Sequence, residues 1–179
     1  MRRYLCYARY VLRHQQCVRR AGFRNGLLWR GVKHDWSKWL PSEFIPYARR
    51  FYLPDGSKRP QTRDATGAYD PTNTGDPDFD RAWFHHQRRN DHHWQWWLNP
   101  QQREGTRPTE MSKGAVVEML CDWSGAGRAQ GGDGNFSAWW HANNHDMQLH
   151  PRTRELVLAL MPRVLATLGM ALVVDPSAT

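Results

Sequence analysis

A stripe of side chains at helical spacing runs through residues 2–20 and limits the possible folds more than any other feature of the chain. Tyr4, Tyr7, Val11, His14 and Val18 recur at steps of three or four, as on the inner face of an amphipathic helix. The chain offers no convincing strand and no internal repeat. The pattern therefore predicts an all-α protein whose first helix carries a histidine on its inner face.

The remaining helices are recognised by their caps and breakers. Gly22 and Gly26 can end the first helix, and Pro41 can end the second. Further helices are expected at residues 27–39, 42–52, 81–98 (as one helix, or as two joined near Asn90 and Asp91), 110–123 (capped by Thr109), 137–144 and 151–168. A glycine-rich turn is expected after Trp123.

Residues 54–80 are rich in Pro, Gly, Asp and Thr and nearly free of apolar side chains, which predicts a long surface loop after the third helix. A loop of this length inside a compact domain is either a lid or an insertion without a role, and the sequence leaves both open. The 179 residues fit one domain, 1–179.

Charge and cysteine content restrict the partners and the compartment. The net charge of +8 favours anionic partners, nucleotides or nucleic acid among them. The three cysteines form no CxxC pair and are odd in number, which argues against disulfides and thiolate zinc and favours a cytoplasmic location. The apolar stretch 156–174 contains Pro162 and Arg163, so a buried helix is expected there and no membrane span.

Imidazoles and carboxylates are distributed so that separate helices could bring them together around a metal ion. His34 and Asp35 are adjacent on the predicted second helix, and Asp122 follows Glu118 by one turn on a later one. Two histidine pairs lie seven residues apart, so on a continuous helix one member of each pair shares a face with one of the other. These pairs are His85–His86 and His92–His93.

The order of these residues resembles that of the HD superfamily, helical metal-dependent phosphohydrolases named for a His-Asp pair. The segment HDWSK at residues 34–38 is similar to the HDxxK form found there, and the HH of HHQRRN resembles the histidine pair of dinuclear members. The whole chain also resembles a group of small uncharacterised phage and bacterial proteins with HDxSK and HHxxxNxHHW motifs. The first resemblance implies a compact, single-domain, HD-like helical bundle.

The superfamily resemblance also implies a set of metal ligands. One divalent ion would be held by His14, His34, Asp35 and Asp122. Asp35 would bridge to a second ion held by His86 and His93, with the choice within the two histidine pairs left open. Such ligands suit Mn, Fe, Ni or Zn, as one ion or two.

The implied reaction is hydrolysis of a nucleotide or a related phosphate ester by metal-activated water. Asp35, Lys38 and His86 are assigned to catalysis. Lys38 could contact the phosphate as a point charge, and arginines could do so through two hydrogen bonds. The candidate arginines are Arg88, Arg89 and Arg128.

Two other readings remain open. The basic charge and the tryptophans, interpreted first as core residues, could instead form a nucleic-acid-binding surface. A di-iron oxygenase would keep the metal and change the reaction. The sequence argues against a P-loop, because SGAGRAQGGDG lacks the preceding strand and the following Lys-Ser/Thr. It leaves the substrate and the oligomeric state open.

Overall fold

A computed structural model of the chain describes residues 1–61, 74–101, 105–129 and 136–170. Over these ranges the protein is all-α, since its regular structure is helical except for one small antiparallel hairpin. This confirms the predicted fold class. No helix in the described ranges combines the length and the apolar character needed to cross a bilayer.

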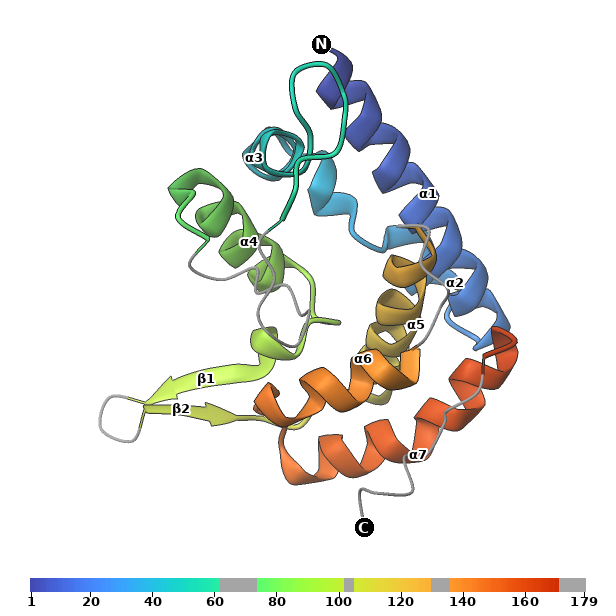
Figure 1. Ribbon diagram of the computed structural model, residues 1–179. Coiled ribbons are helices and arrows are strands. Elements are labelled where there is room, and N and C mark those ends of the chain that lie inside the picture. The colour runs from blue at the N-terminus through green and yellow to red at the C-terminus, as the bar shows by residue number, and fades with distance from the viewer. Residues whose placement is uncertain (62–73, 102–104, 130–135, 171–179) are drawn as a thin grey trace.

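The elements are α-helices and short 3₁₀ helices (η) joined mostly by tight turns (Figure 1). In chain order they are α1 (Arg2–Arg24), α2 (Leu28–Lys33), η1 (Trp36–Trp39), α3 (Pro41–Phe51), α4 (Pro77–Arg89), η2 (Trp94–Trp97), β1 (Leu98–Gln101), β2 (Gly105–Pro108), α5 (Lys113–Ala129), α6 (Phe136–Asn143), η3 (Asn144–Asp146) and α7 (Pro151–Thr167).

Helix α1 joins two apolar cores. Toward its C-terminal end it packs on α5, which also packs on α7, and Val18 of α1 belongs to this core. Toward its N-terminal end it packs on α3, which pairs with α4, and Tyr7 and Val11 belong to this second core. His14 lies on α1 between Val11 and Val18, so the inner stripe places it where the two cores meet.

The predicted helix over residues 27–39 is wrong, because the chain leaves the helix at His34 and Asp35. Asp35 has φ 54° and ψ 28°, a left-handed conformation that cannot continue an α-helix. The side-chain amide of Gln15 on α1 donates to the carbonyl oxygens of both residues, at 2.9 and 3.3 Å. The carbonyl oxygen of Asp35 also accepts from the N–H of Lys38 at 3.0 Å, as η1 begins. Pro41 then begins α3, where the missing N–H of proline costs nothing.

Residues 81–98 do not form one helix; the alternative of a break near Asn90 and Asp91 is confirmed, although the second helical segment is only the short 3₁₀ helix η2. Helix α4 ends at Arg89, where the side-chain amide of Asn90 donates to the carbonyl oxygen of His86 at 2.8 Å. A turn carrying His92 and His93 follows, and then η2. The expectation that the two histidine pairs share helix faces is therefore corrected, since the second pair is not helical.

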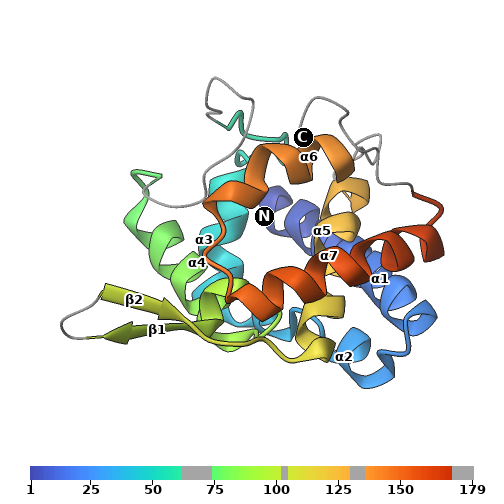
Figure 2. The same cartoon turned by 90° about the horizontal axis from the view of Figure 1, so that it is seen from below.

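The hairpin of β1 and β2 contradicts the prediction of no strand. Leu98 pairs with Pro108 and Gln101 with Gly105, and the hairpin extends away from the helices beside α4 (Figure 2). Neither strand alternates apolar and polar residues, and both are largely exposed. Hydrophobic periodicity therefore could not find them.

Several predicted boundaries shift. Helix α4 begins at Pro77, capped by Asp76, whose carboxylate accepts from the N–H of Phe79 at 3.2 Å, so the loop ends earlier than residue 80. Ser112, not Thr109, accepts from the first turn of α5. Residues 124–129 of the expected glycine-rich turn continue α5. The rest of that turn, and residues 62–73 of the loop, lie outside the described residues.

Candidate metal centre

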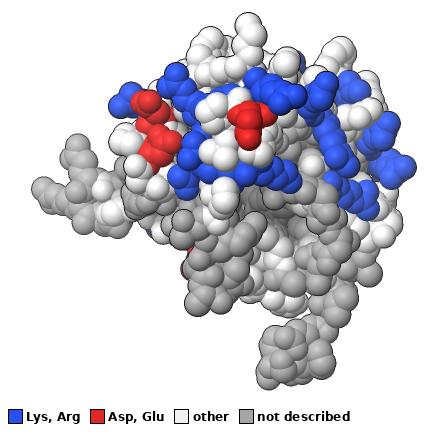
Figure 3. All heavy atoms as spheres, turned by 45° about the horizontal axis from the view of Figure 1, so that its top comes forward, with Lys and Arg blue, Asp and Glu red and all other residues white. Residues whose placement is uncertain are grey.

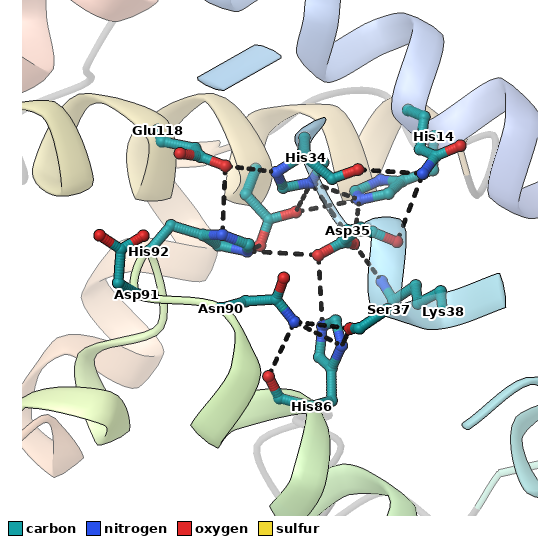
Figure 4. Close-up of polar contacts among 12 residues, drawn as sticks. His14, His34, Asp35, Ser37, Lys38, His86, Asn90, Asp91, His92 and Glu118 are labelled. Carbon is teal, nitrogen blue, oxygen red and sulfur yellow. Dashed lines mark hydrogen bonds and ion pairs between the residues drawn. The ribbon is translucent and has the colours of Figure 1, made fainter. Parts of the chain in front are cut away.

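The first ligand set comes from α1, from α5 and from the turn after α2. Nε2 of His14 lies 3.0 Å from Oδ1 of Asp122 and 3.2 Å from Oδ2 of Asp35. Nε2 of His34 lies 3.2 Å from that of His14 and 3.3 Å from Oδ1 of Asp122. The predicted first set is thus brought together, and His14, His34 and Asp35 point toward one another in Figure 4.

The second ligand set faces the other oxygen of Asp35. Nε2 of His86 lies 3.3 Å from Oδ1 of Asp35, and Nε2 of His92 lies 3.4 Å from it. His93 completes the group, with its ring centroid 4.7 Å from that of His86 and 4.3 Å from that of His92. Asp35 therefore offers one carboxylate oxygen to each set.

Four atoms of this second set are buried without a hydrogen-bond partner. They are Oδ1 of Asp35 and the Nε2 atoms of His86, His92 and His93. An unsatisfied buried polar atom costs about 1–3 kcal/mol, so a convergent group of four requires an explanation. A metal ion, which binds through such lone pairs, fits this donor set.

His92 was not predicted as a ligand, and His85 lies elsewhere. The sequence analysis assigned His93 as the ligand and left open whether His92 binds instead, because it placed residues 81–98 on helices. The turn instead brings His92 and His93 to the same group. His85 lines a surface groove of about 270 Å³ between α3 and α4, beside Arg49 and Arg81, and none of the clustered ligands lines that groove.

Two glutamates support the histidines from outside. Oε1 of Glu118 accepts from Nδ1 of His34 at 2.9 Å, and it lies 3.2 Å from Nδ1 of His92. Oε2 of Glu43 accepts from Nδ1 of His86 at 2.9 Å and from the hydroxyl of Ser37 at 2.8 Å. The sequence analysis noted Glu118 only for its position one turn before Asp122, and it missed the role of Glu43.

The ionisation of the carboxylates favours cation binding. Burial would raise the pKa of Asp35, but the adjacent His34, Lys38 and His86 hold that pKa well below its usual range. Burial likewise opposes ionisation of Asp122, yet the hydrogen bonds from His14 and His34 lower its pKa strongly. Both carboxylates are therefore anionic at neutral pH, as metal ligands must be.

Among the histidines the pKa shifts differ. Burial lowers the pKa of His34, but the charge of Asp35 and the hydrogen bonds to Asp122, Asp35 and Glu118 together outweigh burial and raise that pKa well above its usual value. The pKa of His93 falls well below its usual value because burial and the nearby His92 and His86 disfavour its charged form. A neutral His93 can donate a lone pair to a cation without losing a proton first.

Of the four cations assigned to the substrate, only Lys38 contacts the ligand cluster. Its Nζ lies 2.5 Å from Oδ2 of Asp35, and its side chain is 12% exposed. Arg89 donates to Glu43 at 2.6 Å and to Ser42 at 3.1 Å. Arg88 and Arg128 instead bond backbone carbonyl oxygens, those of Leu98 and Leu168. The cluster is partly exposed at Lys38, at His93 and at Asp122, whose side chain is 13% exposed.

Fold and site together define an all-α protein with a buried histidine–carboxylate cluster that could hold metal ions. The chain belongs to a family of unknown function, DUF5662, which matches residues 3–162. No curated protein and no solved structure matches the chain.

Proposed function

We propose that the protein is an HD-like metal-dependent phosphohydrolase that acts on a nucleotide or a related phosphate ester. The observation that carries the proposal is the pair of buried ligand sets that share Asp35, one oxygen to each set. The sets are of the kind that hold one or two divalent ions such as Mn, Fe, Ni or Zn. The unpaired cysteines Cys6, Cys17 and Cys121 support a cytoplasmic location for such a protein.

When bound, divalent ions supply Lewis acidity, which lowers the pKa of water to near 7 and neutralises phosphate oxygens. The protein's own residues supply the rest. Asp35 and Asp122 contribute the negative charge that retains cations, and the histidines contribute neutral lone pairs. Lys38, at the exposed edge of the cluster, places a positive charge where an anionic phosphate would enter.

The test begins with elemental analysis of the purified protein and of Asp35→Ala, with circular dichroism to show that both are folded. We expect one or two equivalents of a transition metal in the parent, and their loss in the variant. Nucleotides and simple phosphate esters are then screened with the metal-loaded parent. A folded Asp35→Ala protein that keeps its full metal content overturns the proposal. Iron-loaded, coloured protein without phosphatase activity points to a di-iron oxygenase instead.

A second candidate function is binding of single-stranded nucleic acid. Residues 1–39 contain ten Lys and Arg but a single acidic residue, Asp35, which is buried. Apolar side chains are exposed on the same segment, with Trp29 72% and Trp36 53% accessible. Lys and Arg also gather on the face shown in Figure 3. Exposed aromatic rings among cations suit base stacking and phosphate contacts.

Fluorescence titration with a single-stranded oligonucleotide tests this second function. Affinity should fall steeply as salt rises, and it should fall further in a Trp29→Ala, Trp36→Ala double variant. Trp96→Ala, an exposed tryptophan outside the segment, is the matched control. If the affinity for the oligonucleotide changes neither with salt concentration nor in the double variant, this surface is not the interface.

A further inference from the structure

Glu118 contacts a histidine from each of the two ligand sets. Nδ1 of His34 donates to its Oε1 at 2.9 Å, and Nδ1 of His92 lies 3.2 Å from the same oxygen. His34 belongs to the set with His14, Asp35 and Asp122, whereas His92 groups with His93: its Nε2 lies 3.4 Å from Oδ1 of Asp35 and 3.8 Å from Oδ2 of Asp122. One carboxylate oxygen thus faces both sets from outside (Figure 4).

The other oxygen of Glu118 is held by Arg30. Nε of Arg30 donates to Oε2 at 2.6 Å, and its two terminal nitrogens bind the carboxylate of Asp91 at 2.5 and 3.2 Å. Asp91 directly precedes His92, and its carbonyl oxygen accepts from the indole of Trp97 at 2.7 Å. Through Arg30, the position of Glu118 on α5 is therefore tied to the turn that carries His92.

His86 has a separate arrangement. Its Nδ1 is bonded to Glu43, which is held by Ser37 and Arg89, and none of these three residues bonds to Glu118 among the described contacts. Glu43 therefore supports one ligand of one set. Glu43 is therefore the matched comparison for Glu118. Both carboxylates contact the Nδ1 atom of a histidine, but Glu43 contacts one histidine and Glu118 contacts two.

Resting on the proposed metal-dependent function with two ions bound, we propose that Glu118 is a positioning residue shared by both metal positions. A carboxylate that accepts from Nδ1–H fixes the tautomer in which the Nε2 lone pair faces the ion. One carboxylate oxygen would thus hold His34 for one ion and His92 for the other, so loss of Glu118 would affect both ions.

The experiment compares Glu118→Gln with Glu43→Gln by titrating metal-free protein with Mn²⁺, using electron paramagnetic resonance to count free and bound ions. Loss of an outer carboxylate typically weakens metal binding about 10–100-fold. We expect Glu118→Gln to weaken the binding of both ions by such a factor. Glu43→Gln should weaken one ion and leave the other at parental affinity.

A second readout follows the tautomers directly. ¹⁵N chemical shifts of the imidazole nitrogens, measured with Zn²⁺ bound, report which nitrogen carries the proton. In Glu118→Gln two histidines should lose the hydrogen-bonded Nδ1–H signature, whereas in Glu43→Gln one should. If Glu118→Gln fails to fold, Arg30→Gln, which leaves the carboxylate in place, should still weaken both ions in parallel.

The outcomes separate this inference from the proposed function. A parent that binds two ions, with only one of them weakened by Glu118→Gln or Arg30→Gln, overturns the shared role and leaves the phosphohydrolase proposal standing. Two ions weakened equally by Glu43→Gln would also overturn it, because the effect would not depend on sharing. A folded parent that binds no Mn²⁺ or Zn²⁺ removes the proposed function itself.

Discussion

Nε2 of His14 on α1 lies 3.0 Å from Oδ1 of Asp122 on α5. This contact depends on how closely the two helices pack, because each residue comes from the middle part of its helix. Gly125, one turn after Asp122, is the point of close approach. A Cβ atom built there would lie 2.7 Å from Cγ2 of the buried Val18. The small residue on α5 thus permits the spacing at which the ligands meet.

Gly125→Ala should therefore destabilise the protein and widen the ligand spacing. Overpacking a tight interface costs about 1–3 kcal/mol, and Val18 is β-branched and cannot easily turn away. Gly127→Ala, on the same helix, is the matched control because nothing lies within 4 Å of its Cβ. It should stabilise the helix by up to about 1 kcal/mol. Urea unfolding of the metal-free variants measures the change in the free energy of unfolding for each substitution. Equal stability of the two variants would contradict the packing argument.

The two histidine pairs give a second prediction. His92→Ala should remove the ion proposed to sit beside Oδ1 of Asp35, because the imidazole lies 3.4 Å from that oxygen. His85→Ala should leave the metal content unchanged, since His85 lines the groove between α3 and α4. Metal content by elemental analysis, on proteins shown to be folded, measures the difference. Loss of metal in the His85 variant alone would mean that His85 is a ligand and His92 is not.

Much of the site could be predicted because its ligands follow local rules. His14 sits on a helical stripe, His34 and Asp35 are neighbours in the chain, and Asp122 lies at helical spacing from Met119. Helical periodicity, which the sequence shows directly, places His14 and Asp122, and adjacency in the chain keeps His34 and Asp35 together.

The rest depended on contacts between distant segments. The left-handed conformation of Asp35 accompanies bonds from Gln15, twenty residues earlier. His92 reaches the cluster because the chain leaves the helix at Asn90 and turns. The sequence analysis had instead placed His92 on a helix. Glu43 and Glu118 each bond a histidine that is remote in sequence. No local pattern distinguishes them from other helical glutamates, and propensity alone cannot find such partners.

Metal binding should depend on pH through His34. Burial lowers its pKa, but the charge of Asp35 and the hydrogen bonds to the neighbouring carboxylates together raise that pKa well above the usual value in the metal-free protein. The imidazole is therefore protonated at neutral pH, and a cation must displace that proton to bind. Affinity should rise with pH by up to about tenfold per unit for one displaced proton, until the pH passes the raised pKa.

Calorimetric titration with Zn²⁺ in buffers of different ionisation enthalpy counts the protons released. At least one proton per cluster is expected near neutral pH. The control is Asp146→Asn, an exposed carboxylate beside His145, which should leave the proton count unchanged. An affinity that stays constant between about pH 6 and 8 would mean that His34 binds without deprotonating.

Lys38 provides the last prediction, because it separates metal binding from substrate binding. Its ammonium contacts Oδ2 of Asp35 and reaches the exposed edge of the cluster, so it is a competitor for cations and an attractor of anions. Lys38→Met should keep the metal, or bind it more tightly, since a positive charge beside the ligands is gone. Hydrolysis of a phosphate ester should fall by about 100-fold in kcat/KM, the cost of losing one charge-stabilising group at a reacting centre.

Arg88→Met is the matched control, since Arg88 bonds the carbonyl of Leu98 and stacks on Phe84. It should leave both the metal content and kcat/KM unchanged. If Lys38→Met instead loses its metal while remaining folded, the ammonium supports the ligand geometry, and the phosphate contact must be sought at another residue.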